Sequence, residues 1–386
     1  MLHSRQAPNS YLRRTFFGSL LVFSLLSGQS AHALDNIGFV SASGTSLIFN
    51  GKTFTPKGMN LMDHDTLWYA DRTTPTFTYL KEKDFKSLKA SGFNSVRLSV
   101  KTDYFQNVKP PYSFNEAGFQ WVDQIISLAK RNNIKLILDM HMPTGGVQQD
   151  YQINSVNQQF WNDPWLKGRF VDVWREIAKR YANEPTIWAY DLMNEPATTD
   201  FVAYEGLMKN TVSSIRAYDP NHLIMLQRGM FIKADGSWSM KYPEVDDFQI
   251  IRSIHFYQPT DFTLQSAPWF TTKKVSVTYP TPSAKETKDM WNATRIRNEL
   301  TSLTQEAQSS TIPVVLTEFG TLFPKRLTGQ LQWVTDVASI AQNLGLGWHY
   351  WHYSGPSCTN AFALKSKYGT CRPLTLKTLS GFAIVN

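Results

Sequence analysis

The sequence predicts an α/β protein of the (β/α)8 TIM-barrel class, preceded by a short N-terminal β-hairpin. Apolar, strand-like runs alternate with helical stretches along the chain, and repeated strand–helix units imply a parallel sheet. Eight strand-like runs are present and no long hydrophilic linker separates them. Eight such units close into a barrel, so a single barrel domain over residues 34–386 is expected.

Residues 1–33 have the pattern of a secretory signal. Arg13 and Arg14 precede a short apolar stretch at 16–26, and Ala31-His32-Ala33 fits a signal-peptidase cleavage site. The apolar stretch is too short, and too often interrupted by Ser and Gly, to span a membrane well. We therefore expect cleavage near Ala33, a secreted or periplasmic protein, and no stable membrane insertion afterwards. An uncleaved membrane anchor is the alternative.

The predicted elements follow in order. Residues 38–54 alternate between apolar and polar around Asn50-Gly51, a strong hairpin-turn signal, and we expect this hairpin to close the bottom of the barrel. Strands are expected at 55–60, 93–100, 134–142, 187–193, 223–227, 248–257, 312–319 and 345–353. Helices are expected at 81–90, 115–131, 165–181, 201–218, 291–308 and 327–343, with a short terminal helix near 374–379. The Thr-, Ser- and Pro-rich stretch 258–288 is expected to form a long loop on the active face.

Composition excludes several functions. The formal net charge of +8 falls to about +5 when Arg5, Arg13 and Arg14 leave with the signal, and the basic residues are scattered, so we expect no nucleic-acid partner. No His-Glu-x-x-His, Cys-x-x-Cys or phosphate-type glycine loop is present, so no metal and no cofactor is expected. The two cysteines, Cys358 and Cys371, suggest one disulfide in an exported protein; two buried free thiols are the alternative.

Two strand-like runs end in a single glutamate. The run at 187–193 leads into Asn194-Glu195-Pro196, and the run at 312–317 leads into Glu318. Burying a carboxylate costs several kcal/mol, so a Glu at the lip of a buried strand faces a cleft. Two lone carboxylates at the C-terminal ends of barrel strands are the groups needed to cleave a glycosidic bond. The 12 Trp residues also suit a cleft for sugars, whose apolar faces stack on indole rings.

With the other strand-end residues, the chain resembles glycoside hydrolase family 5, which contains many endoglucanases and mannanases. The resemblance covers nearly all of the chain after residue 33. The matching pieces, in family order, are Gly58-Met59-Asn60, Asn94 to Arg97, Asp139-Met140-His141, Asn194-Glu195-Pro196, His255-Phe256-Tyr257, Thr317 to Gly320 and Gly347 to Trp351.

The resemblance implies a retaining mechanism with Glu195 as general acid/base and Glu318 as nucleophile. Carboxyl groups roughly 5–5.5 Å apart allow a covalent glycosyl intermediate, whereas a wider gap admits a water molecule and inverts. Two anions this close raise one pKa, and we expect the raised pKa to be that of Glu195. The alternative is that either Glu is an ion-pair partner at a strand end.

Six further residues are expected to bind substrate or support the carboxylates. Arg97 is expected to keep Glu318 ionised and oriented, and Asn194 to donate to the sugar 2-hydroxyl. Tyr257 is expected to donate to Glu318. The remaining assignments are His141 and His255 as substrate or carboxylate partners and Trp351 as the sugar platform of the −1 subsite.

Several neighbours have competing interpretations. A lone strand His or Tyr is more often part of the core, and Trp348 has the same alternative. Asp139 and Asp191 are interpreted as internal charge partners. Six other aromatic residues have two possible roles, lining the cleft or packing in the protein: His64, Trp68, Trp161, Trp269, His349 and His352.

The predicted function is an exported, retaining β-glycosidase acting on a β-linked polysaccharide, most simply an endo-β-1,4-glucanase (cellulase). On the same fold, β-mannan, β-1,3-glucan or an exopolysaccharide are alternative substrates, because substrate choice lies in the loops. A non-catalytic polysaccharide-binding protein is the alternative of a different class. A monomer is expected.

Overall fold

The structure is a computed structural model. It describes residues 38–68, 71–76, 79–150, 155–233, 235–265, 267, 269–270, 277–281, 290–308, 311–322, 328–358 and 362–384. Residues Ile37–Asn386 form one compact unit. The predicted signal, 1–33, lies outside the described residues, as does much of the predicted loop 258–288.

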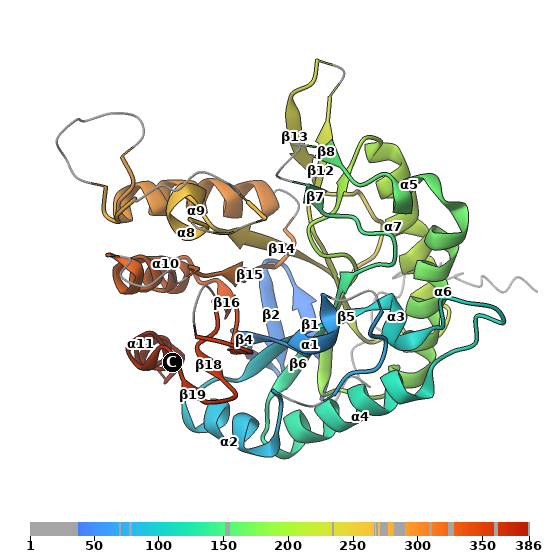
Figure 1. The fold of residues 1–386 in the computed structure, drawn as a ribbon, viewed down its shortest axis with the longest axis horizontal. Helices are drawn as coiled ribbons and strands as arrows, with labels where there is room; N and C mark the ends of the chain where they lie inside the picture. Colours follow the sequence, from blue (N-terminus) through green and yellow to red (C-terminus); the bar gives the residue numbers. More distant parts are fainter. Residues whose placement is uncertain are drawn as a thin grey trace, which may run out of the picture. The chain divides into compact units, whose positions relative to one another are not determined.

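A closed barrel of eight parallel strands forms the centre of this unit (Figure 1). Its strands are β4 (Lys57–Met62), β5 (Ser95–Lys101), β6 (Lys135–Met142), β9 (Ile187–Asp191), β11 (Leu223–Leu226), β14 (Ile250–Phe256), β15 (Val314–Phe319) and β16 (Gly347–Tyr350). They pair in chain order, and β16 closes the ring on β4, with Trp348 opposite Lys57. All eight predicted strands are confirmed, with ends shifted by a few residues.

Helices surround the barrel in Figure 1. The longer ones are α2 (Glu82–Ala90), α4 (Glu116–Arg131), α6 (Pro164–Tyr181), α7 (Phe201–Arg216), α9 (Ala293–Ala307), α10 (Gln330–Asn343) and α11 (Pro373–Ile384). Four begin at an Asn or Asp whose side chain accepts a hydrogen bond from the first turn, which satisfies an otherwise unpaired backbone N–H. These caps are Asn115, Asp163, Asp200 and Asn292. The last helix extends beyond the predicted 374–379.

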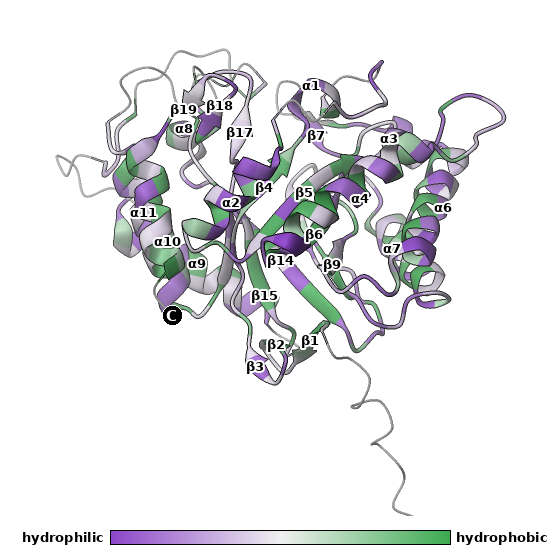
Figure 2. Ribbon diagram, turned by 90° about the horizontal axis from the view of Figure 1, so that it is seen from below, coloured by the Kyte–Doolittle hydropathy of each residue, from purple (hydrophilic) through white to green (hydrophobic). Residues whose placement is uncertain are grey.

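A three-stranded antiparallel sheet closes the bottom of the barrel (Figure 2). Its strands are β1 (Val40–Ser43), β2 (Ser46–Phe49) and β3 (Lys52–Thr53). Asn50 and Gly51 both have positive φ (49° and 73°), as the predicted tight hairpin turn requires. Val40 and Leu47 pack in one buried cluster with Trp188 and other barrel-strand residues. The predicted hairpin is confirmed, with one more strand than expected.

Short elements at the opposite end of the barrel had no signal in the sequence. They form a three-stranded sheet of β10 (Ala197–Thr198), β12 (Gly229–Ile232) and β13 (Trp238–Lys241), a pair of β7 (Gln149–Asp150) and β8 (Ser155–Val156), and a sheet of β17 (Ser354–Gly355), β18 (Lys365–Ser366) and β19 (Gly369–Thr370). The short helices are α1 (His64–Leu67), α3 (Thr102–Phe105), α5 (Gln159–Asn162) and α8 (Thr260–Thr263). Across the described residues, no helix has both the length and the apolar character that a membrane span needs.

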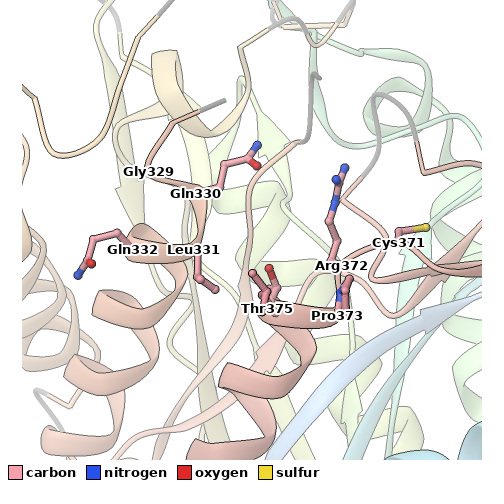
Figure 3. Close-up of a pocket in the computed structure, with 9 residues that line it drawn as sticks. Gly329, Gln330, Leu331, Gln332, Cys371, Arg372, Pro373 and Thr375 are labelled. Atoms are coloured by element: carbon pink, nitrogen blue, oxygen red, sulfur yellow. The ribbon is translucent and has the colours of Figure 1, made fainter. Parts of the chain in front are cut away.

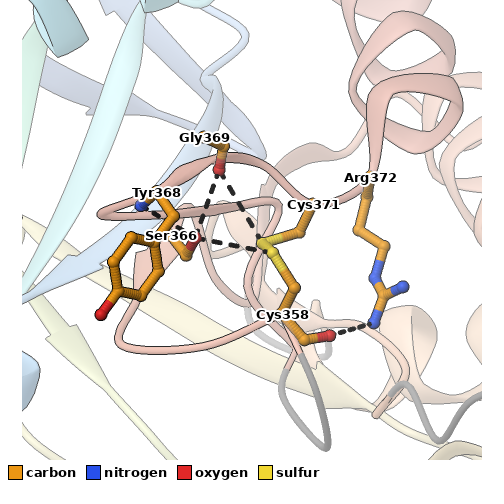
Figure 4. The surroundings of a disulfide bond; sticks show 6 residues. All are labelled: Cys358, Ser366, Tyr368, Gly369, Cys371 and Arg372. Atoms are coloured by element: carbon orange, nitrogen blue, oxygen red, sulfur yellow. Dashed lines mark hydrogen bonds between the residues drawn. A yellow bond between two sulfur atoms is a disulfide. The ribbon is translucent and has the colours of Figure 1, made fainter.

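Cys358 and Cys371 form a disulfide beside the β17–β19 sheet, as predicted (Figure 4). Their Cα atoms are 5.1 Å apart and 13 residues apart in sequence. The guanidinium of Arg372 donates to the carbonyl oxygen of Cys358 at 3.0 Å. The bridge therefore fixes the loop between the last barrel strand and α11.

Candidate active site

The two glutamates at the strand ends meet at the mouth of the barrel. Glu195 follows β9 and Glu318 lies near the end of β15, beside His255 of β14. His255 Nδ1 lies 2.9 Å from Glu195 Oε1 and 3.6 Å from Glu318 Oε2. One side-chain ligand atom from each of the three residues lies within 4.8 Å of the others. The structure thus brings both predicted carboxylates into one site.

Glu318 is held at both of its oxygens. Arg97 Nη1 donates to Oε1 at 2.6 Å, and the hydroxyl of Tyr257 donates to Oε2 at 2.8 Å. The Glu318 side chain is only 4% exposed. Because each oxygen has its own donor, the carboxylate cannot rotate without losing a hydrogen bond, and its orientation is well defined.

Arg97 is fully buried and serves as the hub of this site. Its Nε donates to Asp191 at 2.9 Å, its Nη1 also donates to Asn60 Oδ1 at 3.0 Å, and its Nη2 lies 2.9 Å from Asp139. Burial lowers the pKa of Arg97, but the charges of Asp139, Asp191 and Glu318 outweigh this and raise it. Asp139 and Asp191 are thus the internal charge partners that the sequence predicted.

A second chain of contacts leads from Asp139 to Asn194. His141 Nδ1 lies 2.8 Å from Asp139 Oδ2, and its Nε2 lies 3.4 Å from Asn194 Nδ2. In the tautomer that donates its Nδ1 proton to Asp139, Nε2 is free to accept from the Asn194 amide. Asn194 Oδ1 accepts from Arg97 Nη2 at 2.8 Å, which fixes which way its amide points.

Trp351 faces the site and Trp348 does not. The Trp351 ring stacks on His141, with ring centroids 5.0 Å apart and planes 9° apart, and the 42% exposed Trp68 lies against its edge. Trp348 is fully buried between Phe93 and Phe319, as a core residue. The core interpretation of Trp348 is therefore correct.

The structure corrects the expected pKa of Glu195. Burial raises this pKa, but the hydrogen bond from His255 and the charges of His255, His141 and Arg97 lower it below 4.5. For His255, burial lowers the pKa, but the charges of Glu318 and Glu195 and the bond to Glu195 raise it above 6.5. The expectation of a raised Glu195 pKa is therefore wrong, because the pKa of Glu195 is lowered while that of His255 is raised.

Glu195, His255 and Glu318 could by spacing also hold a cation. The guanidinium of Arg97 contacts Glu318 at 2.6 Å and already supplies the positive charge there. A second cation beside it would be repelled, since like charges at this range are unfavourable. The residues present therefore fit an organic acid–base site, and the expectation of no metal stays a prediction.

Burial distinguishes the residues that pack in the protein from those that can line the cleft. Trp161 is buried and donates to the Ala197 carbonyl at 2.6 Å. His349 and His352 are buried, and burial lowers the pKa of each to about 3. These three are structural. Trp68 lies beside His141 and Trp351, while Trp269 is 48% exposed in a loop of the same face.

Two residues of the site had no signal in the sequence. Gln148 and Gln227 both contact the backbone around Glu195. Gln227 is a polar residue at the end of a predicted strand, but that position alone does not distinguish a site residue from a surface one.

A surface pocket lies apart from the carboxylates, between the start of α10 and the turn into α11 (Figure 3). Its lining is Gly329, Gln330, Leu331, Gln332, Cys371, Arg372, Pro373, Leu374 and Thr375. None of these described lining residues has a carboxyl group, so they do not supply the acid–base chemistry.

A parallel eight-stranded barrel with paired carboxylates at its mouth is the arrangement that many glycoside hydrolases use. A family model for cellulase, glycosyl hydrolase family 5, matches residues 47–357. The chain belongs to this family, as the sequence motifs predicted.

Known proteins agree with this assignment. Endoglucanase C of Acetivibrio thermocellus is 26% identical over 295 residues, which cover 72% of this chain and 84% of that protein. Cellodextrinase A of Ruminococcus flavefaciens is 28% identical over 192 residues, 50% of this chain and 55% of that one. Among solved structures, the endoglucanase Cel5A of Thermotoga maritima has a TM-score of 0.66 at 21% identity, covering 84% of this chain and 96% of that one. The structural likeness confirms the fold.

Proposed function

We propose that this glycoside hydrolase is an exported endo-β-1,4-glucanase that acts with net retention, with Glu318 as nucleophile and Glu195 as general acid/base. The observation that carries the proposal is the separation of the two side chains, whose ligand atoms lie within 4.8 Å. Retaining glycosidases hold their carboxyl groups about 5–5.5 Å apart, and inverting ones about 6.5–9.5 Å. A separation of no more than 4.8 Å between one oxygen of each carboxyl group supports the closer, retaining arrangement.

In the first step, Glu318 attacks the anomeric carbon while Glu195 protonates the departing glycosidic oxygen. His255 Nδ1 is 2.9 Å from Glu195 Oε1, which is close enough for the two groups to exchange a proton. In the second step, Glu195 removes a proton from water, which releases the sugar from Glu318. Arg97 and Tyr257 aim the Glu318 carboxylate in both steps.

The sugar in the −1 subsite rests against Trp351, whose stacking partner His141 keeps the indole in place. Asn194 Nδ2 is proposed to donate to the sugar 2-hydroxyl, a contact that strengthens in the transition state. The exposed ring of Trp68 next to Trp351 extends the aromatic surface for the next sugar.

The identity of the substrate is drawn from relatives named endoglucanase and cellodextrinase. A weaker match to a probable mannan endo-1,4-β-mannosidase of Aspergillus terreus, 25% identical over 249 residues, makes β-mannan the second candidate. Both polymers are β-1,4-linked, and they differ in the configuration of the 2-hydroxyl near Asn194.

Export and a monomeric state are part of the proposal. The disulfide supports export, because such bonds persist in oxidising compartments. Mass spectrometry of the mature protein should find Leu34 as the first residue, and size-exclusion chromatography with light scattering should find one chain. A mass that includes residues 1–33 would contradict export with cleavage.

The test of function is a panel of soluble β-1,4-glucan, β-1,3-glucan and β-mannan, assayed for reducing ends and product length. We expect reducing ends from the β-1,4-glucan with an early fall in viscosity, as endo action requires. Glu318→Ala should abolish this release, since no group then attacks the anomeric carbon. Binding of the β-1,4-glucan without any release by the wild-type protein would support a binding protein instead.

A further inference from the structure

The peptide between Asn194 and Glu195 leaves the barrel ladder. The last ladder contact of this segment is the Asn194 N–H, which donates to the Met140 carbonyl of β6 at 3.1 Å. The chain then turns sharply, and Glu195 has a φ of +46°, in the left-handed region. For a residue other than Gly this conformation is strained, so the surrounding structure must impose it.

Two glutamine side chains hold the two polar atoms of this peptide. Its C=O accepts from Gln148 Nε2 at 3.2 Å, and its N–H donates to Gln227 Oε1 at 3.0 Å. Gln148 follows β6 and Gln227 follows β11, and these are the two strands that flank β9 in the barrel. The peptide is thus held by hydrogen bonds from segments on both sides of β9.

Each glutamine amide is itself oriented by its other contacts. Gln227 Nε2 donates to both carboxylate oxygens of Asp191, at 3.1 and 3.0 Å, so only its oxygen can face the Glu195 N–H. Gln148 Nε2 also donates to the His141 carbonyl at 2.6 Å. The Gln227 backbone carbonyl accepts from the hydroxyl of Tyr204 at 2.8 Å. If the Asn194–Glu195 peptide were flipped, its C=O would face the Gln227 oxygen and its N–H would face the Gln148 amide. Acceptor would then meet acceptor and donor would meet donor.

We propose that Gln148 and Gln227 are positioning residues that clamp the Asn194–Glu195 peptide and thereby aim the acid/base carboxyl. The inference rests on the proposed role of Glu195. Gln227 further connects the two carboxyl groups, because its partner Asp191 accepts from Arg97, which in turn contacts Glu318. One continuous hydrogen-bonded chain therefore links the backbone of Glu195 to the carboxylate of Glu318.

The test compares Gln227→Leu and Gln148→Leu with the wild type on two aryl β-glycosides, one with a good and one with a poor leaving group. Only the poor leaving group needs full protonation by Glu195 in the first step. We expect kcat/KM for the poor leaving group to fall about tenfold or more beyond any loss for the good one, since a misplacement of about 1 Å can cost 10²-fold. In both variants, added azide should restore part of the turnover of the substrate with the good leaving group. Azide is an anion that attacks the glycosyl-enzyme directly, so it does not need Glu195 as a general base.

Gln249→Leu is the matched control. Gln249 is also a buried glutamine whose Oε1 accepts a backbone N–H, that of Ala42 at 3.2 Å, but it lies at the bottom of the barrel. We expect it to lower the melting temperature without changing the ratio of kcat/KM between the two leaving groups. A purely structural role for Gln227 would make the two variants behave alike.

Gln227→Glu adds a pH-dependent readout. When protonated, the introduced carboxyl can accept from the Glu195 N–H and donate to Asp191, as the amide does. When ionised it repels the Asp191 carboxylate, which raises the pKa of the introduced carboxyl, while Arg97 beyond Asp191 partly opposes this. Other titratable groups around it are Tyr204, Asp139, His255 and Glu195. We expect a leaving-group ratio close to the wild type at low pH and close to Gln227→Leu at high pH.

The outcomes distinguish a failure of the proposed positioning role of Gln148 and Gln227 from a failure of the proposed glycosidase function. A wild-type protein that cleaves no β-glycoside would refute the proposed function itself. An active wild type with equal losses for both leaving groups in Gln227→Leu and Gln148→Leu, and no pH-dependent ratio in Gln227→Glu, would overturn the clamp. If Gln227→Leu does not fold, Gln148→Leu and Gln227→Glu decide the question by the same ratio.

Discussion

At the scale of single residues, the site depends on one buried cation. Arg97 contacts Asp139, Asp191 and Glu318, so its charge is compensated within the protein rather than by water. Removing one member of such a buried cluster leaves uncompensated charge, which typically costs 3–5 kcal/mol. Arg is required here because its planar, five-donor group reaches several acceptors at fixed angles, which a lysine cannot do.

Arg97→Lys should therefore keep the charge and lose the geometry. We expect kcat to fall at least about tenfold and the free energy of unfolding to drop by about 3 kcal/mol. Steady-state kinetics and urea titration measure both. Arg169→Lys is the control, because Arg169 is buried with Asp103 and contacts neither glutamate. An Arg97→Lys enzyme with the wild-type kcat would show that the orientation of Glu318 does not depend on this group.

The proton shared by His255 and Glu195 predicts the basic side of the pH profile. The raised pKa of His255 means that the pair keeps its proton above pH 6.5 and loses it as pH rises through that raised value. Activity should fall on the same rise, because Glu195 then has no proton to give. In His255→Asn the imidazole that sets this limb is absent, so the fall should no longer occur at its wild-type pH. A basic limb that does not move would assign the titration to another group.

The sequence predicted which residues form the site better than how they are protonated. Glu195, Glu318, Arg97 and Tyr257 were identified because motifs at barrel strand ends must converge. The sign of the Glu195 pKa was missed, because it depends on a hydrogen bond from His255, 60 residues away in sequence. Gln148 and Gln227 were missed because a glutamine outside a motif has no distinctive signal.

At the scale of elements, strands and helices were predictable because their apolar periodicity is local, whereas the two-residue strands of the loops exist only through pairing.

Packing explains why two of the motif positions are glycine. A Cβ on Gly58 would lie 2.2 Å from the Ser95 carbonyl oxygen, and one on Gly320 would lie 2.4 Å from that of Trp351. Glycine at these positions thus allows neighbouring backbones to approach closely and takes no part in the reaction.

The disulfide gives the prediction that belongs to this scale. Replacing Cys358 and Cys371 together by Ser should lower the free energy of unfolding by at most about 3 kcal/mol, because the bridge closes a short loop. Activity should change little, since neither cysteine contacts the carboxylates in the described structure. Denaturant titration with parallel kinetics measures this, and two free thiols in the unreduced, folded wild type would remove the bridge from the account.

At the scale of the whole molecule, the barrel separates stability from chemistry. The β1–β3 sheet closes the bottom with apolar contacts, while both carboxylates and their partners lie at the opposite end. The fold could be predicted because eight strand–helix units have one common solution. Substrate choice could not, since it depends on loops, part of which lie outside the described residues.

The most direct test of the account is the anomeric configuration of the first product, followed by proton NMR during hydrolysis of a soluble β-1,4-glucan. Attack by Glu318 followed by attack of water inverts the anomeric carbon twice, so we predict that the β-anomer forms first and the α-anomer appears only by slow mutarotation. The α-anomer as first product would mean that water attacks directly, and the two carboxylates would not share a double displacement.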